Sequence, residues 1–256
     1  MNLASRVTSD TAYGPDLRST RDLAVDVWYA QLSMAAERLP EHSQCLSSDE
    51  QVRAARFHFD QHRARFIAGR GLLRHLLSRY LDEPPERIRF GYGPQGKPFL
   101  LEYPDLRFNL SHAADVLLVA VAQHRAIGVD VEPVPSDGVV DSVSGIVFSA
   151  PERSSLLAST GLQRRELFAR LWTRKEAYIK AEGQGMSLRL DCIDVSTSPD
   201  RVLLLNDSRD QWLPSPHWTL RSFPPSPSYA ASVAAEGPDW QSTLRVWPPD
   251  TGETER

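Results

Sequence analysis

The segment 127–132, which reads IGVDVE, constrains the fold more strongly than any other part of the chain. A β-strand points successive side chains to opposite faces, so the aliphatic residues at 127, 129 and 131 share one face, and Asp130 and Glu132 share the other beside Gly128. Neighbouring carboxylates repel each other unless a cation or a hydrogen-bond donor lies between them. Oxygen ligands without a nearby His or Cys favour Mg²⁺, which takes one or two carboxylates together with substrate phosphates. The pattern predicts a strand against a core, with either a metal site or an exposed edge that carries two acids.

Residues 163–182 predict one long helix, which Gly183 ends. The residues at helical spacing on its inward face are Leu167, Phe168, Leu171, Lys175, Tyr178 and Ile179. Lys175 stands inside this apolar stripe, and a buried ammonium requires an anion. Glu176 and Lys180 lie one turn apart on the edge of the stripe. They form either an ordinary salt bridge beside a tryptophan, or a third carboxylate for a metal and an ammonium for a phosphate.

Three shorter motifs carry weaker signals. Ser111 and His112 follow a predicted strand and could donate to a phosphate, although a histidine at a strand end is often structural. The triplet 96–98 (GKP) predicts a turn whose backbone could approach a base or a phosphate. Ser149 and Glu152 have the spacing of a helix capping box, which is the structural alternative to a catalytic role for Glu152.

Helices flanked by short strands, in two halves, predict an α+β protein. A helical region is expected over 47–80, and a proline-containing segment at 133–147 is expected to join two lobes. Residues 1–24 and 237–256 lack a clear pattern and are expected to be a flexible leader and a frayed tail. The expected strands are 25–32, 99–101, 107–110, 116–122, 126–132, 192–195, 201–205, 218–223 and 229–234.

Composition excludes several classes of function. With 256 residues and 41% hydrophobic content, the chain can form one sizeable core or two lobes that share one. A net charge of -4 argues against a nucleic-acid partner. Cys45 and Cys192 are far apart and read as ordinary cytosolic thiols. Neither a signal peptide nor an apolar run of about 20 residues is evident, so we expect a cytoplasmic protein without a membrane partner.

Positive charge is unevenly distributed. Of the 29 basic residues only Lys97, Lys175 and Lys180 are lysines, and each falls in one of the motifs above. Between Arg53 and Lys97 there are ten Lys or Arg against four Asp or Glu. This excess is either a solvated helix face or a lobe that binds anions.

Taken together, these motifs resemble the Sfp-type family of 4'-phosphopantetheinyl transferases over about residues 47–190. The residues that carry the resemblance are Gly96-Lys97-Pro98, Phe108-Asn109-Leu110-Ser111-His112, Gly128-Val129-Asp130-Val131-Glu132 and Trp172-x-x-Lys175-Glu176-Ala177-x-x-Lys180, with Arg53, Arg56-Phe57 and Arg65-Phe66 upstream. Each motif alone is modest, but the four in this order are highly specific. One departure stands out: the family often has two lysines in its first basic block, whereas this chain has Arg53 at one place and Glu50 at the other.

The resemblance implies roles for matching residues. Asp130, Glu132 and Glu176 would hold Mg²⁺, or alternatively Mn²⁺, with the pyrophosphate of coenzyme A. Lys180 would bind phosphate oxygens, and Lys175 would lie near the phosphate on the pantetheine side. The co-substrate implied is coenzyme A, and the implied partners are apo acyl or peptidyl carrier proteins.

The nucleotide end of coenzyme A has its own implied set of residues. His112 would bind phosphate oxygens, and Arg53 and Arg65 would grip the 3'-phosphate with Ser111 or His112. The triplet 96–98, that is Gly96, Lys97 and Pro98, would line the adenine end. The departure at the first basic block leaves one cation of this end unassigned.

The implied reaction is attack of a carrier serine on the phosphorus that bears pantetheine, with 3',5'-ADP as the leaving group. Glu176 or Glu152 would accept the serine proton, and both alternatives stay open, with Glu176 favoured. The implied fold is two similar α/β lobes related by a pseudo-twofold axis, 25–135 and 136–236, with the site in the cleft between them. Such a chain is expected to act as a monomer. The alternative functions are a non-catalytic relative that binds coenzyme A or carriers, and a Mg²⁺-dependent nucleotide pyrophosphatase.

Overall fold

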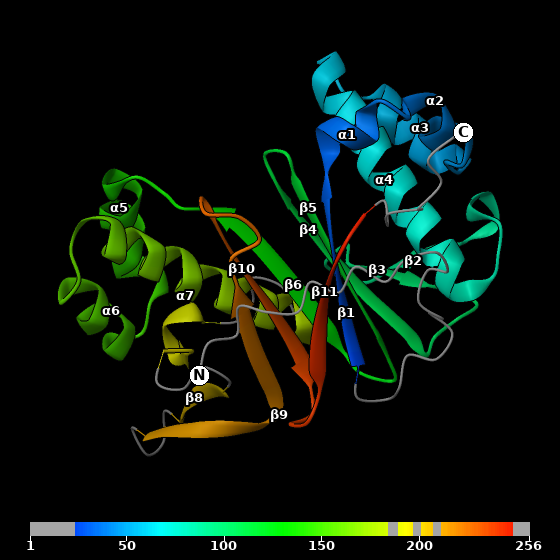
Figure 1. The fold of residues 1–256 in the computed structure, drawn as a ribbon. Helices are drawn as coiled ribbons and strands as arrows, with labels where there is room; N and C mark the ends of the chain where they lie inside the picture. The colour runs from blue at the N-terminus through cyan, green and yellow to red at the C-terminus, as the bar shows by residue number, and fades with distance from the viewer. Residues whose placement is uncertain (1–23, 184–188, 197–200, 207–210, 248–256) are drawn as a thin grey trace, which may run out of the picture.

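A computed structural model describes residues 24–183, 189–196, 201–206 and 211–247. The fold is mixed α+β, as the sequence predicts, and two larger sheets lie between two groups of helices (Figure 1). The first elements are β1 (Ala24–Gln31), α1 (Leu32–Ala36), α2 (Leu39–Gln44), α3 (Ser48–Ala55), α4 (Asp60–Leu81), β2 (Phe90–Tyr92), β3 (Pro98–Leu100), β4 (Leu106–Ala113) and β5 (Val116–Gln123). The others are β6 (Ile127–Pro133), α5 (Asp137–Val147), α6 (Ala150–Leu157), α7 (Gly161–Glu182), β7 (Ile193–Asp194), β8 (Arg201–Asn206), β9 (Gln211–Phe223), β10 (Tyr229–Glu236) and β11 (Gln241–Val246), with 3₁₀ turns at Pro85–Arg87 and Leu190–Cys192.

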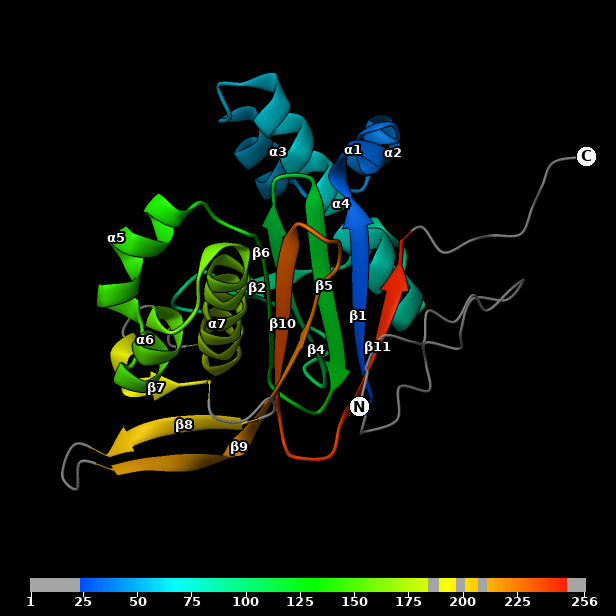
Figure 2. The same cartoon turned by 60° about the vertical axis from the view of Figure 1, so that its left-hand side comes forward.

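The two larger sheets share an apolar core. One has the strand order β11-β1-β5-β4 and the other β6-β10-β9-β8-β7, while β2 and β3 form a separate hairpin. The alternation predicted for β6 is confirmed, because its aliphatic side chains are buried in one cluster with residues of β1, β5 and β10. The opposite face of β6 lies against α7 (Figure 2). This packing leaves Asp130 and Glu132 facing the helix rather than the core.

Each sheet is covered by one long helix. Helix α4 packs its buried leucines against β1, β4 and β5, and α7 packs Phe168, Leu171 and Ile179 among residues of α5, α6, β8 and β10. Helices α1–α4 gather at one end of the molecule and α5–α7 at the other (Figures 1 and 2). The predicted helix over 163–182 is confirmed, and it ends at Gly183 in the left-handed conformation with φ 74°.

Several expectations differ from the structure. The helical region 47–80 is two helices, α3 and α4, and α1, α2 and α5 were not expected. The short apolar pattern of α5 is interrupted by glycines, which is why it resembles a linker. Ser111 and His112 lie within β4, whereas the sequence predicts that they follow the strand. Strand β6, expected in the first lobe, pairs with β10 in the second sheet.

The expectation of a frayed tail over 237–256 is wrong for part of that range. Residues Gln241–Val246 form β11, which pairs in parallel with β1. Parallel pairing joins segments that are distant in the sequence, so no local sequence pattern indicates it. Residues 248–256, like the expected leader over 1–23, lie outside the described residues.

The two halves repeat one local pattern. The tripeptide Val-Asp-Val occurs in β1 with Asp26 at its centre and in β6 with Asp130 at its centre, and both aspartates are buried. A Ser-x-x-Glu capping box opens α3 and another opens α6. Helices α4 and α7 both have 22 residues. A basic residue stands fifteenth in each helix, and the two are Arg74 and Lys175.

Candidate active site

Asp130 is the centre of the candidate site, where β4, β6 and α7 meet. Its Oδ1 accepts hydrogen bonds from Ser111 Oγ at 2.8 Å and from Lys180 Nζ at 2.6 Å. Lys180 Nζ also donates to Ser111 Oγ at 3.0 Å. Asp130 is 2% exposed, and its Oδ2 accepts no hydrogen bond from the part of the chain that the structure describes. A buried carboxylate oxygen without a donor is costly, so this position is incomplete without a further partner.

Glu132 and Glu176 add negative charge beside Asp130. Burial raises the pKa of Asp130, although the Lys180 ammonium and Ser111 oppose this. Burial and then the Asp130 charge raise the pKa of Glu132 and of Glu176, and Glu176 also acts on Glu132. The three acids therefore lie close enough to repel one another, and the Lys180 ammonium does not fully neutralise them. Like charges held together in this way are relieved either by protonation or by an added cation.

A basic rim lies next to the acids. Burial lowers the pKa of His112, and the positive charges of Lys180 and Arg65 lower it further. His112 thus lies within electrostatic range of both cations. Arg53 lies over the ring of Phe66, with 5.3 Å between its Cζ and the ring centre.

The donor set fits a magnesium ion better than a metal held entirely by protein. Within the described ranges, no three His, Cys, Asp or Glu side chains are placed to enclose an ion by themselves. Mg²⁺ differs from structural metals in needing only one or two carboxylates, since waters and substrate oxygens complete its octahedral shell. The free Oδ2 of Asp130 and the raised pKa values of Glu132 and Glu176 match that requirement.

Glu152 and Lys175 pair with each other, and both are fully buried. They form an ion pair of 2.8 Å in which the side chains are 0% and 1% exposed. Glu152 Oε2 accepts the amide of Ser149 and Oε1 accepts the amide of Val195, at 2.8 and 2.9 Å. Lys175 Nζ also donates to the carbonyls of Leu190, at 2.6 Å, and Ile193. Every polar atom of the pair is engaged within the fold in this conformation.

The roles that the resemblance implies, Glu152 as a base and Lys175 as a phosphate ligand, therefore stay predictions. The capping-box alternative is the one that the geometry supports, since Glu152 accepts the N-cap amide while its own amide donates to Ser149 Oγ at 3.3 Å. The sequence correctly indicates that Lys175 needs an anion. The identity of that anion depends on how α6 packs against α7, which a sequence pattern does not contain.

Glu50 explains the departure in the first basic block. It is 2% exposed, and ion pairs join it to Arg74 at 2.7 Å and to Arg70 at 2.9 Å. Arg70 also lies over the rings of Phe90 and Tyr92, at 4.8 and 5.8 Å. Two arginines of the basic segment are therefore engaged within the fold, and the sequence reasoning did not identify either of them as a partner of Glu50.

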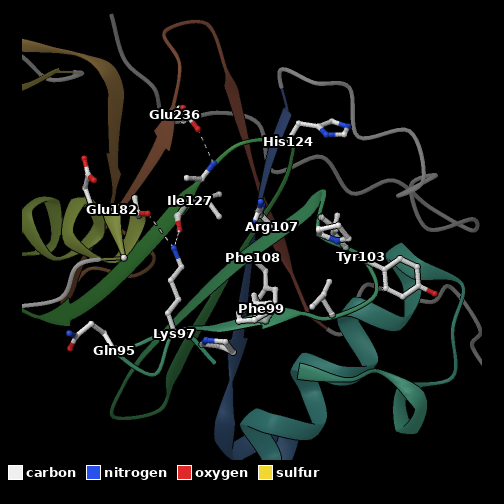
Figure 3. A pocket seen from close by; sticks show the side chains of 18 residues that line it. Gln95, Lys97, Phe99, Tyr103, Arg107, Phe108, His124, Ile127, Glu182 and Glu236 are labelled. Carbon is white, nitrogen blue, oxygen red and sulfur yellow. Dashed lines mark hydrogen bonds between the residues drawn. The ribbon is translucent and has the colours of Figure 1, made fainter. Parts of the chain in front are cut away.

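The triplet 96–98 forms the expected turn, with Gly96 in the left-handed conformation at φ 76°. The Lys97 side chain leaves this turn and points to Ile127 and the end of α7, beside a cavity of about 370 Å³ (Figure 3). Lys97, Pro98, Phe99 and Arg107 line this cavity, whereas Asp130 does not. The cavity is thus separate from the acidic cluster.

Gly128 determines how closely α7 approaches β6. A Cβ atom at this position would lie 2.1 Å from the carbonyl oxygen of Ala177 and 2.4 Å from the amide nitrogen of Ala181. Only glycine allows such an approach. The contact brings Glu176 and Lys180 within range of Asp130, so the glycine noted in the sequence is part of the site's architecture.

This fold and site define an α+β protein whose clustered acids and basic rim suit a phosphorylated ligand. A family model described as 4'-phosphopantetheinyl transferase superfamily matches residues 126–234. A second, described as 4'-phosphopantetheinyl transferase, N-terminal, matches residues 33–124.

Curated relatives agree with both family models. The chain is 36% identical over 220 residues to the 4'-phosphopantetheinyl transferase HetI of Nostoc sp., which covers 85% of this chain and 90% of the relative. It is 28% identical over 220 residues to the 4'-phosphopantetheinyl transferase Sfp of Bacillus subtilis, covering 85% and 94%. The chain belongs to the 4'-phosphopantetheinyl transferase family and is a transferase of this class.

One solved structure is also similar in part. A holo-(acyl-carrier-protein) synthase from Bacillus anthracis, in complex with CoA (3',5'-ADP), aligns with 44% of this chain and 96% of its own, at 21% identity and a TM-score of 0.34. No helix in the described residues has the length and apolar character needed to span a bilayer.

Proposed function

We propose that this enzyme transfers 4'-phosphopantetheine from coenzyme A to a serine of an apo acyl or peptidyl carrier protein, with a magnesium ion at Asp130, Glu132 and Glu176. The observation that carries the proposal is the buried Oδ2 of Asp130, which lacks a donor among the described residues while its other oxygen is held by Lys180 and Ser111. The resemblance to the family implies a carrier serine as the acceptor and 3',5'-ADP as the second product. Mn²⁺ is the alternative ion with the same oxygen preference.

The metal, when bound, supplies positive charge that stabilises the phosphoryl oxygens and the leaving group. The protein residues orient the reactants around it. Lys180 is 29% exposed, so its ammonium can contact a phosphate while it keeps its bond to Asp130. His112 lies within electrostatic range of Lys180 and of Arg65. We propose that Lys180 and His112 bind phosphate oxygens beside the acidic cluster, and that Arg65 binds the 3'-phosphate.

Glu176 is the residue best placed to take the proton of the attacking serine. It is half-buried on α7, and burial together with the charge of Asp130 raises its pKa. A bound cation would lower that pKa again, so the proposed base role rests on the place of Glu176 in the acidic cluster and not on its pKa. The proton passes from the serine hydroxyl to a carboxylate oxygen of Glu176 while the serine oxygen forms its bond to phosphorus and 3',5'-ADP leaves.

The two halves are proposed to be similar lobes related by a pseudo-twofold axis. The repeated pattern supports this, because each half has a Val-Asp-Val strand and a buried capping-box glutamate. In each half that glutamate pairs with the fifteenth residue of a 22-residue helix, and the pairs are Glu50–Arg74 and Glu152–Lys175. Since one chain contains both halves, we also propose that the enzyme acts as a monomer, which light scattering after size-exclusion chromatography would measure.

Intact mass spectrometry tests the proposed activity. The purified protein is incubated with coenzyme A, Mg²⁺ and apo-carriers from fatty-acid, polyketide and nonribosomal-peptide systems, with an EDTA control. We expect a carrier whose mass rises by one phosphopantetheine group, with an equal amount of 3',5'-ADP. Cleavage of coenzyme A without a carrier adduct would indicate a nucleotide pyrophosphatase instead, and binding without either product would indicate a non-catalytic relative.

A further inference from the structure

Lys97 forms a contact between the two halves that the proposed chemistry does not use. Its Nζ donates to the carbonyl of Ile127 at 2.9 Å, to that of Lys180 at 2.6 Å and to that of Ala181 at 3.4 Å. The first carbonyl belongs to the start of β6, and the other two belong to the last turn of α7. Figure 3 shows the side chain reaching from its turn toward Ile127 beside the cavity.

The partners of this ammonium are unusual, since all three are peptide carbonyls. No ion pair joins Lys97 to a carboxylate within the described part of the chain. The last carbonyls of a helix lack intrahelical donors and carry the negative end of its dipole, so a cation is favoured there. Burial and the nearby Arg107 lower the pKa of Lys97 to about 8, which leaves it mostly charged at neutral pH. Lys97 therefore serves as a cap for α7 that is supplied by another element.

The contact lies directly beside the catalytic groups. Lys180 is held twice: its carbonyl accepts from Lys97, and its side chain donates to Asp130. Between these two bonds, α7 touches β6 at Gly128, the closest approach described above. The two lysines thus fasten α7 to β6 on either side of that glycine.

We propose that Lys97 is a positioning residue, which fixes the end of α7 against β6 and thereby sets where Glu176 and Lys180 stand relative to Asp130. This inference rests on the proposed function of the acidic cluster. Without the ammonium, the carbonyls of Lys180 and Ile127 lose a donor, and the helix end can shift. Loss of a residue that orients a metal-binding group typically lowers metal affinity about 10–100-fold.

The test compares Lys97→Met, which keeps the apolar stem and removes the ammonium, with Arg107→Met. Arg107 lines the same cavity and is exposed, so its variant removes a nearby positive charge without touching α7. Hydrogen exchange of the amides of 177–183 is measured first, because it needs no ligand. We expect severalfold faster exchange in Lys97→Met and no change in Arg107→Met.

The second readout is the Mg²⁺ concentration that half-saturates transfer, measured with kcat and KM for coenzyme A. In Lys97→Met we expect it to rise about tenfold, with kcat falling more than KM rises. Unchanged exchange and unchanged magnesium dependence in Lys97→Met would overturn the inference. If Lys97→Met is too unstable to purify, Lys97→Gln, which keeps one amide donor, is measured by the same criteria. If the wild-type protein transfers no phosphopantetheine, the proposed function is refuted. The hydrogen-exchange result then still decides whether Lys97 holds the end of α7.

Discussion

The two halves of the molecule place an aspartate at the centre of the same Val-Asp-Val tripeptide, yet the two aspartates differ in one respect. Asp26, the closed aspartate, accepts Tyr80 Oη on Oδ2 at 2.8 Å and Arg245 Nε on Oδ1 at 2.9 Å. Asp130, the open aspartate, has both donors on Oδ1, and its Oδ2 accepts nothing from the described residues. Both are almost completely buried, at 3% and 2% exposure.

The difference shows how one local pattern can serve either the scaffold or a site. In the first half, β11 contributes Arg245 beside β1, which satisfies the second oxygen of Asp26. At β6 the flanking positions hold Glu132 and, from α7, Glu176, which add negative charge instead of donors. A fully satisfied carboxylate stabilises the fold, whereas one with a free buried oxygen is available to a cation.

The largest expected effect is a loss of stability at Glu152. Like Asp26, Glu152 has a hydrogen-bond or ion-pair partner for each carboxylate oxygen. Lys175→Met leaves the Glu152 carboxylate buried without its cation, and breaking a buried pair in this way costs about 3–5 kcal/mol. Urea denaturation measures the loss. The matched variant Lys180→Met removes a lysine of the same helix that is 29% exposed, and it should destabilise less when Mg²⁺ is present, because the ion can then replace the lost ammonium beside Asp130. Equal destabilisation by both variants would contradict the distinction between closed and open acids.

Asp130→Asn should have the largest effect on activity. The amide keeps the shape of the side chain but removes a metal-binding charge, so kcat should fall about 10²–10³-fold, the range seen when one preorganised electrostatic group is lost. The free energy of unfolding should stay the same or rise, because a charge is removed from a mutually repelling cluster. Transfer assays and thermal melts of the same preparation measure both quantities. Near-normal transfer by Asp130→Asn would exclude this residue from the metal site.

Asp26→Asn is the matched change in the first half, and we expect it to lower stability while activity is retained. The amide NH₂ cannot accept the hydrogen bond from Tyr80 or Arg245 that the carboxylate oxygen accepts, so stability should fall by about 1–3 kcal/mol. The kcat of the folded protein should remain within about twofold of wild type, since Asp26 is not part of the acidic cluster. A large loss of kcat without a loss of stability would show that the first half also takes part in catalysis.

The smallest expected effect is the pH dependence of stability. Folding raises the pKa of Asp130, Glu132 and Glu176, so the folded state binds more protons than the unfolded state between their ordinary pKa values of 3.8 and 4.5 and the raised ones. The contribution of this cluster to the free energy of unfolding therefore falls as the pH rises through that window. Bound Mg²⁺ relieves the repulsion, so it should raise Tm by about 2–4 °C more above the window than below it.

Asp130→Asn provides the control for that measurement, because it removes one of the three charges. The difference in Tm with and without Mg²⁺ should then depend much less on pH. A magnesium effect that is equal at all pH values, in wild type and variant alike, would contradict the assignment of the raised pKa values to the metal site.

The part of the site that lies on one element could be predicted from the sequence. The alternation of β6 placed Asp130 opposite the core, and the helical spacing of α7 placed Glu176 and Lys180 on one edge, because both periods are local properties of the chain. The need of Lys175 for an anion also followed from its place in an apolar stripe.

What the sequence did not contain were pairings between distant elements. The partner of Lys175 is Glu152, which reaches it only because α6 packs on α7. The sequence pattern does not single out Asp26, because the donor to its second oxygen comes from β11, a strand that no local pattern indicates. The contact of the Lys97 side chain with the end of α7 is not indicated by the sequence, whereas its implied place at the adenine end stays a prediction. These contacts are set by tertiary packing, which overrides local expectation.

The most direct test of the open aspartate is to locate the ion. Crystals grown with Mn²⁺ and coenzyme A, measured at a wavelength where manganese scatters anomalously, would give a peak at the metal. We predict one peak next to Asp130 Oδ2, bridged to the diphosphate, and none beside Asp26. A peak at another place in the cleft, or coenzyme A bound with no ion at Asp130, would contradict the account.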